Sequence, residues 1–333
     1  MPQPKLRTTQ QQTHTPIVHT QLYLNNHRPL PKHGSILNLN NHIKTMFMPR
    51  QIVEQKLLNF LTDDIGQGDT TATTLIPPNL IATAHVIAKE NGTLAGLEEA
   101  TILAEALNLK TQTQTHDGQQ IHKNQILLQL TGHAQTILVV ERTLLNLLSR
   151  MSGIATQTHT LTQQIQTNNP NNNQTIRIAA TRKTAPGLLY FDKKAVLIGG
   201  GDPHRLHLDD MVLIKDNHLA LSGSVEETLK KAKTTTSFSK KIEIEVTTSQ
   251  DALKAAEGGA DIIMLDNFSP KQAKETAQTL RQAGHTKVLL EVSGGITPQN
   301  LLEYANADIN IISIGGLTHS VKALDISLEI IKT

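Results

Sequence analysis

Five cationic side chains lie close together along the chain, and each stands beside a glycine, a proline or the end of an apolar run. They are Arg182, Lys183, His204, Arg205 and Lys215. A single one would most often be solvated surface charge, but so many like charges converge only around an anion. Arg presents a planar pair of donors that suits carboxylate or phosphate, and Lys presents a compact point charge. The pattern therefore predicts a binding site for a small anionic ligand.

Two glycine pairs near the C-terminus indicate a phosphate. Ser293-Gly294-Gly295 and Gly315-Gly316 each follow an apolar run. Glycine lets the backbone approach a ligand closely, and the loops after the last strands of a barrel frequently hold a phosphate on backbone N–H groups. One such pair alone is more often a plain turn. Two pairs after successive runs favour a phosphate ligand.

Three carboxylates also end apolar runs, at Asp216, Glu245 and Asp266. Their oxygens can hold Mg²⁺, directly or through water, or can contact ribose hydroxyls. Structural salt bridges to Lys or Arg are the alternative. We favour that alternative for Glu243, which lies two residues before Glu245 and on the same face of the run.

The elements that must position these residues alternate between strand and helix after residue 175. This alternation implies a parallel sheet. Polar and glycine residues directly after the strands are typical of the active face of a (β/α) barrel, with an open doubly wound sheet as the alternative. We expect strands at Ile176–Ala180, Met211–Ile214, Ile242–Val246, Asp261–Leu265, Val288–Val292 and Asn310–Ile314, and helices at Asp251–Glu257, Lys271–Ala283 and Gln299–Ala305.

The preceding part of the chain has the pattern of a separate mixed α/β unit. Apolar periodicity predicts a helix over Gln51–Leu61, which Thr62 through Gly66 (TDDIG) should break. Strands are expected at Ile81–Lys89 and Gln125–Leu130, and a long buried helix over Thr136–Met151 should close the unit. A polar loop is expected at Asn168–Gln174.

These patterns divide the chain into three parts. Residues 1–47 are rich in Thr, Gln, Asn, His and Pro and are expected to form a disordered extension. A transit peptide and an upstream-extended start, with Met46 or Met48 as the true start, are alternatives for this stretch. Residues 48–150 form the expected N-terminal domain, and residues 151–320 form the expected catalytic domain.

Composition excludes several classes of function. The chain of 333 residues has no Cys, which excludes disulfides, thiolate metal sites and a Cys nucleophile, and is compatible with a reducing compartment. Aromatic residues make up only 2% of it, which argues against stacking platforms for nucleic acid. No apolar run is long enough to span a membrane. Residues 1–50 contain six Lys or Arg and no acid, so the remainder is slightly acidic despite the net charge of +2. We therefore expect small anionic partners, with neither nucleic acid nor membrane involved.

Ten motifs, in this order, resemble the quinolinate phosphoribosyltransferases, also called carboxylating nicotinate-nucleotide pyrophosphorylases. The resemblance covers roughly Gln51 to the C-terminus. The motifs are Asp63 through Thr71 (DDIGQGDTT), Glu141-Arg142-Thr143 with Asn146, Ser152 through Thr156 (SGIAT), Thr181 through Thr184 (TRKT) with Pro186-Gly187, Gly199 through Gly201 with His204-Arg205, Asp210 through His218 (DMVLIKDNH), Ile242 through Val246 (IEIEV), Met264 through Asn267 (MLDN), Ser293 through Ile296 (SGGI) and Leu317 through Ser320 (LTHS).

The resemblance implies an α/β fold with two domains. An N-terminal α/β sandwich domain would pack on the incomplete (β/α) barrel of type II phosphoribosyltransferases, and residues 321–333 would return to the first domain. A homodimer or higher homo-oligomer is implied, in which Arg142 reaches the site of a neighbouring subunit. The residues alone would have assigned Arg142 to a helix surface or a buried salt bridge. A cytoplasmic enzyme is expected.

The implied reaction transfers phosphoribose from PRPP to quinolinate, with loss of pyrophosphate and CO₂, and gives nicotinate mononucleotide for NAD biosynthesis. By similarity, quinolinate is held by Arg142, Arg182, His204, Arg205 and Lys215. PRPP would lie along Lys183, Glu245, Asp266, Ser293, Gly294, Gly295, Gly315 and His319. Mg²⁺ is the implied cofactor, held by Glu245 and Asp266 through water, and the catalytic set would be Lys183, Lys215, Glu245 and Asp266.

The chain departs from the family pattern at a few positions. Ala180 stands where many relatives carry Asp, but small residues occur there and should not disable the site. Val292 and Gly316 each stand where Ala is common, and they are expected to change loop packing without changing charge. The closest rival is a related protein associated with molybdate uptake, against which the intact Lys215 through His218 (KDNH) argues. A catalytically silent nucleotide-binding protein and a generic phosphate-binding barrel isomerase or lyase are less consistent with the charged motifs.

Overall fold

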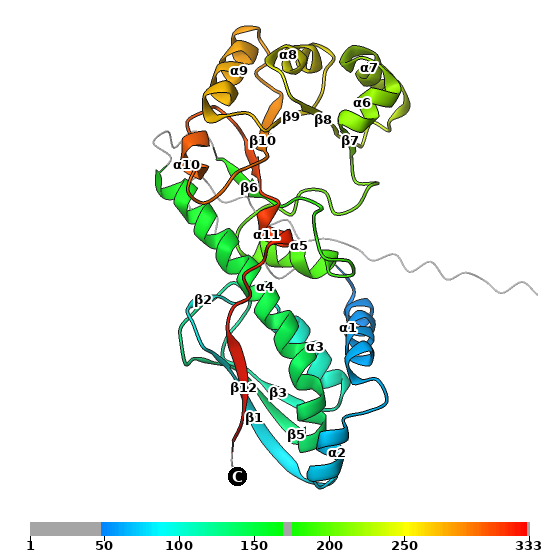
Figure 1. The fold of residues 1–333 in the computed structure, drawn as a ribbon, viewed down its shortest axis with the longest axis vertical. Helices are drawn as coiled ribbons and strands as arrows, with labels where there is room; N and C mark the ends of the chain where they lie inside the picture. Colours follow the sequence, from blue (N-terminus) through cyan, green and yellow to red (C-terminus); the bar gives the residue numbers. More distant parts are fainter. Residues whose placement is uncertain (1–47, 169–174, 332–333) are drawn as a thin grey trace, which may run out of the picture. The chain divides into compact units, whose positions relative to one another are not determined.

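The computed structural model describes residues 48–168 and 175–331. The extension expected at 1–47 and nearly all of the loop expected at Asn168–Gln174 lie outside the described residues. The strands and helices predicted from the apolar pattern can be compared with the structure over the rest of the chain (Figure 1).

The first part of the chain builds a four-stranded antiparallel sheet in the order β12-β1-β5-β3. Its strands are β1 (Ile81–Ala88), β3 (Lys110–Gln112), β5 (Ile126–His133) and the C-terminal β12 (Ile326–Ile331). Alternate residues of β1 are buried, because successive side chains of a strand point to opposite faces and one face packs on the helices. A small two-stranded sheet joins β2 (Gly92–Thr93) to β4 (Gln120–Ile121).

Four helices accompany this sheet in the described residues, and two of them run further than the sequence predicted. They are α1 (Arg50–Ile65), α2 (Thr70–Leu75), α3 (Leu97–Ala106) and α4 (Ala134–Asn168). The helix end predicted at Leu61 is wrong, since Thr62 turns its hydroxyl back to the Leu58 carbonyl at 2.8 Å and α1 continues to Ile65. Within the predicted breaking stretch only Gly66, with φ of 59°, ends the helix. The end predicted at Met151 is also wrong, because the apolar face continues through Leu161 and Ile165.

The second part is a six-stranded parallel sheet in the order β6-β11-β10-β9-β8-β7. The two edge strands, β6 (Arg177–Ala179) and β7 (Val212–Ile214), do not pair with each other, so the barrel is incomplete as expected. The inner strands are β8 (Ile242–Val246), β9 (Ile262–Asp266), β10 (Leu289–Ser293) and β11 (Ile311–Ser313). The accompanying helices are α5 (Leu189–Ile198), α6 (Asp216–Ser222), α7 (Val225–Thr235), α8 (Ser249–Glu257), α9 (Pro270–Gln282), α10 (Leu301–Tyr304) and α11 (Gly316–His319).

Strand register brings the ends of these strands to one level, and three of the helices that follow are capped by hydroxyl side chains. Ser293 of β10 pairs with Asp266 of β9 on one side and with Ser313 of β11 on the other. Helices α7, α8 and α9 are capped by Ser224, Thr248 and Ser269, whose hydroxyls accept backbone N–H groups of the first turn. The residues that follow the strands therefore lie together at the carboxyl end of the sheet.

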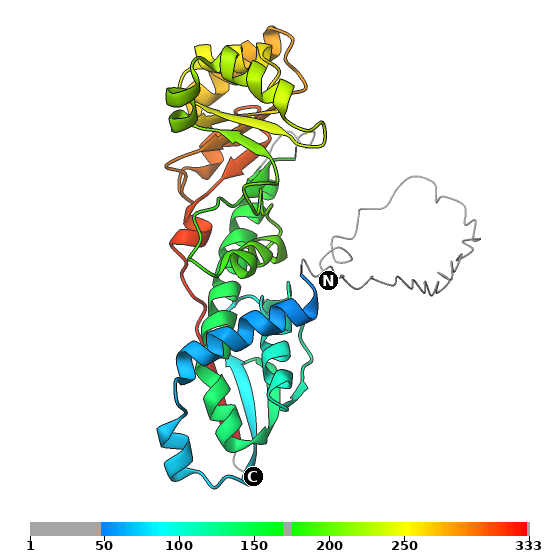
Figure 2. The ribbon, with the colours of Figure 1, turned by 90° about the vertical axis from the view of Figure 1, so that its right-hand side faces the viewer.

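Each sheet has its own apolar core, and α4 contributes to both. Leu144, Leu148 and Met151 lie in the core of the antiparallel part, whereas Leu161 and Ile165 lie in the core of the parallel part. Figure 2 shows α4 running from one part to the other. None of the helices in the described residues is both long and apolar enough to cross a membrane.

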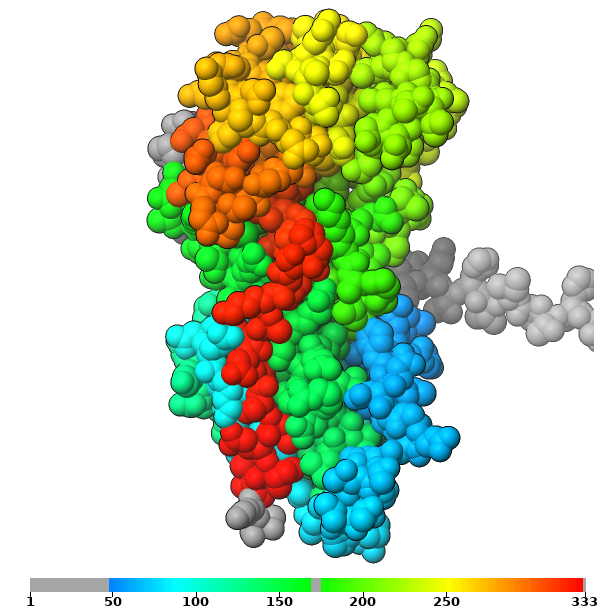
Figure 3. Space-filling model, in the orientation of Figure 1, coloured from blue at the N-terminus to red at the C-terminus, as the bar shows by residue number. Residues whose placement is uncertain are grey.

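The C-terminal segment runs from the parallel part back to the antiparallel sheet, where β12 pairs with β1 (Figure 3). The Leu324 N–H donates to the Ser149 carbonyl of α4 at 2.9 Å. Gly153 of α4 faces this segment so closely that a Cβ there would lie 2.2 Å from the Lys322 carbonyl oxygen. Only glycine allows the segment to lie this close to the helix.

We predict that Gly153→Ala destabilises the protein by about 1–3 kcal/mol, because the added methyl must displace backbone rather than a flexible side chain. Urea unfolding followed by circular dichroism measures the change. The control is Thr160→Ala, on an exposed position of the same helix, which should change stability by less than about 0.5 kcal/mol. Equal stability of Gly153→Ala and wild type would contradict the close packing.

Candidate active site

A cavity of about 380 Å³ opens at the carboxyl ends of the parallel strands. Most of the residues selected from the sequence line it: Lys183, His204, Arg205, Lys215, Glu245, Asp266, Ser293, Gly294 and Gly295. Lys183 follows β6, His204 and Arg205 lie in the loop between α5 and β7, and Lys215 follows β7, whereas the carboxylates come from the ends of β8 and β9. The cavity therefore has one cationic side and one side that carries carboxylates and glycines.

Three further candidates, Arg182, Gly315 and His319, lie near this cavity without lining it. Gly315 packs against Lys183 and His319, since a Cβ at Gly315 would lie 3.2 Å from Lys183 Cδ and 3.1 Å from His319 Cδ2. Arg182 is close enough to Arg205 that its positive charge, after burial, lowers the pKa of Arg205. Both Arg182 and His319 are exposed.

Arg142 is not brought to the cavity by its own chain. It lies on α4 with a side chain that is 64% exposed, and its charged contact is Glu141 at 3.9 Å. Together with Asp69, Thr71 and Leu75 it lines a separate pocket beside α2. Within one chain, then, this guanidinium is displayed at a surface and not at the strand ends.

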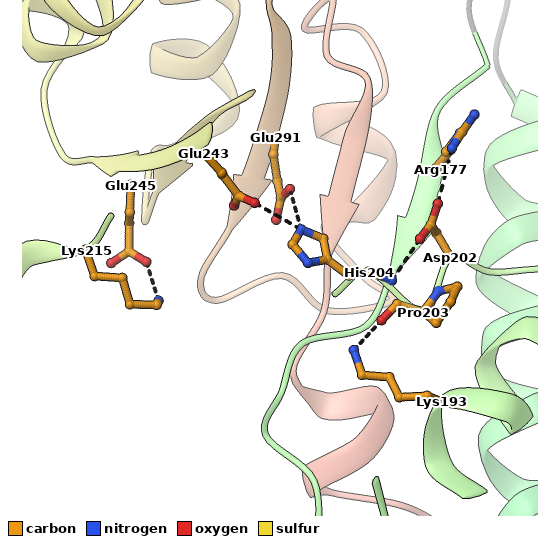
Figure 4. A network of polar contacts seen from close by, with 9 residues as sticks. All are labelled: Arg177, Lys193, Asp202, Pro203, His204, Lys215, Glu243, Glu245 and Glu291. Carbon is orange, nitrogen blue, oxygen red and sulfur yellow. Dashed lines mark hydrogen bonds and ion pairs between the residues drawn. The ribbon is translucent and has the colours of Figure 1, made fainter. Parts of the chain in front are cut away.

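His204 is held between two buried carboxylates (Figure 4). Its Nε2 lies 3.2 Å from Glu291 Oε2 and 3.3 Å from Glu243 Oε2, and both glutamates are fully buried. Burial disfavours a charged imidazole, but the contacts to Glu243 and Glu291 outweigh it and raise the pKa of His204 to about 10. His204 is therefore an imidazolium at neutral pH. Its second ring nitrogen, Nδ1, makes no hydrogen bond to any described residue.

The loop before His204 fixes the direction of this side chain. Asp202 extends the free edge of β6, because its N–H donates to Ile178 and its carbonyl accepts from Ala180. Its carboxylate accepts the His204 N–H at 2.8 Å, and His204 has a left-handed φ of 54°. Beneath the loop, the buried Lys193 donates its Nζ to the Pro203 carbonyl (Figure 4).

Lys193 is a buried cation that sequence reasoning did not select. Burial lowers its pKa to about 8, the charges of Arg182 and Arg205 act in the same direction, and Asp202 opposes them. Its position within helix α5 offered no signal, because a Lys beside Lys194 in the run Leu189–Ile198 resembles ordinary helix surface. Lys193 supports the loop and does not line the cavity.

The carboxylate side of the cavity is coupled to the cationic side by one ion pair. Lys215 Nζ lies 2.6 Å from Glu245 Oε2. Burial raises the pKa of the neighbouring Asp266, and the negative charge of Glu245 adds to this effect, while Asn267 donates its Nδ2 to Asp266 at 2.7 Å. The two carboxylates are thus close enough to interact, and a cation between them would relieve their repulsion.

Ser293 through Gly295 form a tight turn against Asn267. Gly294 and Gly295 have φ of 92° and 64°, a region that glycine adopts without strain. A Cβ on Gly294 would lie 2.2 Å from Asn267 Oδ1, so the turn admits no side chain there. The turn lines the cavity, and that its backbone binds a phosphate stays a prediction.

The prediction for Glu243 was wrong in its partner, and Glu291 was missed. Glu243 forms an ion pair with His204, and not with Lys or Arg, because the left-handed turn at His204 directs the ring at the sheet. Glu291 lies two residues before Ser293, as Glu243 lies two residues before Glu245. An acid inside an apolar strand run was therefore the available signal.

Two family models match the chain in succession. The model described as "Quinolinate phosphoribosyl transferase, N-terminal domain" matches residues 69–152. The model described as "Quinolinate phosphoribosyl transferase, C-terminal domain" matches residues 154–329. Together they cover most of the chain, including most of β12.

Individual relatives agree with the family models. The probable carboxylating nicotinate-nucleotide pyrophosphorylase of Methanothermobacter thermautotrophicus is 43% identical over 268 residues, which are 80% of this chain and 95% of the relative. The carboxylating nicotinate-nucleotide pyrophosphorylase of Homo sapiens is 36% identical over 247 residues, 74% of this chain and 82% of the relative. The structure of the nicotinate-nucleotide pyrophosphorylase from Francisella tularensis superposes with a TM-score of 0.77 at 34% identity, over 86% of this chain and 98% of that one. By sequence and by fold, the chain belongs to the quinolinate phosphoribosyltransferase family.

Proposed function

We propose that this protein is the enzyme that transfers phosphoribose from PRPP to quinolinate, releasing pyrophosphate and CO₂ and forming nicotinate mononucleotide for NAD biosynthesis. The observation that carries this proposal is the cavity at the strand ends, where Lys183, Arg205 and the imidazolium of His204 face the carboxylates Glu245 and Asp266. A dicarboxylate and a diphosphate need such a density of cations, and a ribose needs hydrogen-bonding carboxylates beside them.

Quinolinate fits the cationic side of the cavity. Arg182 and Arg205 lie close together, so their repulsion is relieved when an anion binds between them. His204 adds a fixed positive charge with Nδ1 available as a donor, and Lys215 adds a point charge next to Glu245. Two ring carboxylates shared among these groups would be held in one orientation.

PRPP fits the opposite side, along the ends of β8 to β11. Glu245 and Asp266 are placed for the ribose, and the turn Ser293 through Gly295 offers close backbone approach to a phosphate. Lys183, with Gly315 and His319 beside it, adds positive charge for the departing pyrophosphate. The ion pair joins Lys215, assigned to quinolinate, to Glu245, assigned to PRPP, so the two reacting groups would meet there.

The chemistry then needs positioning and electrostatics and no covalent nucleophile. The ring nitrogen of quinolinate forms a bond to C1 of the ribose as the bond to pyrophosphate breaks, and the ribose passes through an oxocarbenium-like state. Lys183 stabilises charge on the leaving group, and Glu245 and Asp266 stabilise charge on the ribose. Loss of CO₂ from ring C2 leaves an electron pair beside the positively charged nitrogen, and a proton takes its place.

Mg²⁺ is part of the proposal, with Glu245 and Asp266 as the residues that would hold it through water. The raised pKa of Asp266, caused by burial and by the charge of Glu245, fits a pair of carboxylates that a divalent cation would stabilise. Two carboxylates are a small ligand set, which suits a cation that keeps several waters and binds substrate phosphates. When bound, Mg²⁺ would supply charge neutralisation of the diphosphate.

We further propose a homodimer or larger homo-oligomer in which Arg142 of one chain completes the quinolinate site of its neighbour. The support is that Arg142 is displayed at a surface pocket of its own chain and does not line the cavity. A cytoplasmic location, predicted from the resemblance, stays a prediction.

The purified protein should convert quinolinate and PRPP, with Mg²⁺, into nicotinate mononucleotide and an equal amount of CO₂. Chromatography of the nucleotide and release of label from the C2 carboxylate measure the two products. Lys215→Met should be folded and nearly inactive, since it removes a cation that contacts Glu245. A folded wild-type protein that forms neither product would disprove the proposed function.

Arg205→Ala should raise KM for quinolinate about 10- to 100-fold, because it removes a charge-assisted hydrogen bond of roughly 1.5–3 kcal/mol. KM for PRPP should change much less, and steady-state kinetics with each substrate varied in turn gives both values. Lys230→Ala, which removes one exposed positive charge from α7, is the control. An equal rise of both KM values would show that Arg205 is not specific to quinolinate.

Stability should fall as pH rises from about 6.5 to about 8 because of His204, since above about pH 8 the lowered pKa of Lys193 acts in the opposite direction. Its pKa is raised from an ordinary 6.5 to about 10, so the stability it contributes is fully present below pH 6.5 and is lost as pH rises through about 10. The expected slope is at most about 1.4 kcal/mol per pH unit. Urea unfolding at several pH values measures it.

His204→Gln should lack this decline, whereas His133→Gln in the antiparallel sheet should retain it. The same slope in His204→Gln as in wild type would mean that His204 is not held as an imidazolium.

A further inference from the structure

Arg150 lies near the middle of α4 and connects three helices with one guanidinium. Its Nε and Nη2 donate to the two carboxylate oxygens of Asp192 on α5, each at 2.8 Å, and Nη2 also donates to the Thr318 carbonyl on α11 at 2.9 Å. Asp192 and Thr318 are fully buried. Helices α5 and α11 both pack on α4 (Figures 1 and 2).

Both partners of Arg150 lie against the same loop, Arg182 to Ala185. The Thr318 hydroxyl donates to the Lys183 carbonyl at 2.9 Å. Burial raises the pKa of Asp192, and the Ala185 backbone opposes this rise, so Ala185 lies close to the carboxylate. The loop from Arg182 to Ala185, which carries two of the candidate substrate ligands, is thus hydrogen-bonded to Thr318 and lies beside Asp192, the two partners of one side chain.

This arrangement is more than a link between two helices. A bidentate pair between Arg150 and Asp192 would be sufficient to join α4 to α5. The third hydrogen bond, to Thr318, adds the segment that contains Gly315 and His319, next to the Lys183 side chain. None of Arg150, Asp192 and Thr318 lines the cavity, so any effect on the reaction must pass through the loop.

We propose that Arg150 is a positioning residue that acts through Asp192 and Thr318 to hold the Arg182–Ala185 loop, and so sets where Lys183 enters the cavity. This inference rests on the proposed function, because it takes Lys183 as a ligand of PRPP. Lysine could keep the charge at this position but could not make the parallel pair to Asp192 and also reach Thr318.

A second buried ion pair, between α5 and α3, offers a matched control. Lys194, which also lies on α5, pairs with the fully buried Glu99 of α3 at 2.7 Å. Removing either cation leaves a buried carboxylate unpaired, so Arg150→Met and Lys194→Met should lose comparable stability. Only Arg150 is connected to the loop.

The first test is amide hydrogen exchange of the peptide that covers residues 181–188, measured by mass spectrometry on the full chain. Arg150→Met and Thr318→Val should each speed exchange of this loop by about tenfold, because each removes one link of the hydrogen bonds that run from Arg150 through Thr318 to Lys183. Lys194→Met should leave its exchange close to wild type. Equal exchange in Arg150→Met and Lys194→Met would overturn the proposal.

The second test is a double-mutant cycle on kcat/KM for PRPP. Arg150→Met should lower it about 10²-fold, the effect expected of a small misplacement of a substrate ligand. Thr318→Val should lower it alone but add little in the Arg150→Met background, because both act through Lys183. Fully additive effects would place Arg150 outside the loop's support.

Two safeguards keep the outcomes separate. If Arg150→Met does not fold, Arg150→Lys and Thr318→Val are used for both tests. Arg150→Lys should then exchange faster than wild type in the loop and have a lower kcat/KM for PRPP, with both effects smaller than those predicted for Arg150→Met. A folded wild type without activity would contradict the proposed function, whereas the exchange experiment would still decide the role of Arg150. Unchanged loop exchange in Arg150→Lys and in Thr318→Val would contradict the inference whatever the activity.

Discussion

The ends of the parallel strands gather opposite charges in a small volume, and the site depends on how those charges are balanced. Glu243 and Glu291 compensate His204 from inside the sheet, and Glu245 compensates Lys215. Arg182 and Arg205 have no comparably close carboxylate among the described residues. Burial lowers the pKa of Arg205, and the positive charge of Arg182 lowers it further. The cationic side of the cavity is therefore prepared for an anion before one binds, which is the condition for electrostatic preorganisation.

Buried carboxylates in this position change what the histidine can do. A neutral imidazole could accept a proton, whereas an imidazolium fixed by two glutamates acts as a constant positive charge and a hydrogen-bond donor. That role agrees with a reaction in which the substrate brings its own nucleophilic nitrogen. It also explains why a left-handed backbone at His204 is tolerated, since the contacts to Glu243 and Glu291 offset a strain of about 1 kcal/mol or more.

Helix α4 relates the two halves of the fold to one another. It contributes to both apolar cores, accepts the returning C-terminal segment at Ser149 and Gly153, and carries Arg150 between them. The boundary expected at residue 150 lies within this helix, beside that arginine. A loop of the catalytic sheet is thus supported from a helix that begins in the antiparallel part, and the two parts share one structural element rather than a flexible linker.

The amino-acid sequence by itself determined the parallel sheet and the identity of most residues around the cavity. Polar residues that directly follow apolar strands must meet at one face, so Lys215, Glu245, Asp266 and Ser293 could be selected without coordinates. Helix ends were less predictable, since Thr62 to Ile65 continue α1 and the apolar face continues α4 beyond Met151.

Only the tertiary structure decided which side chains contact one another. Glu291 reaches His204 across 87 positions of sequence, and Arg150 reaches Thr318 across 168. Such partners depend on strand register and helix packing, which no local pattern of residues contains. The residue types at the site follow from the sequence, and their pairing follows from the fold because burial determines which charges must find a partner.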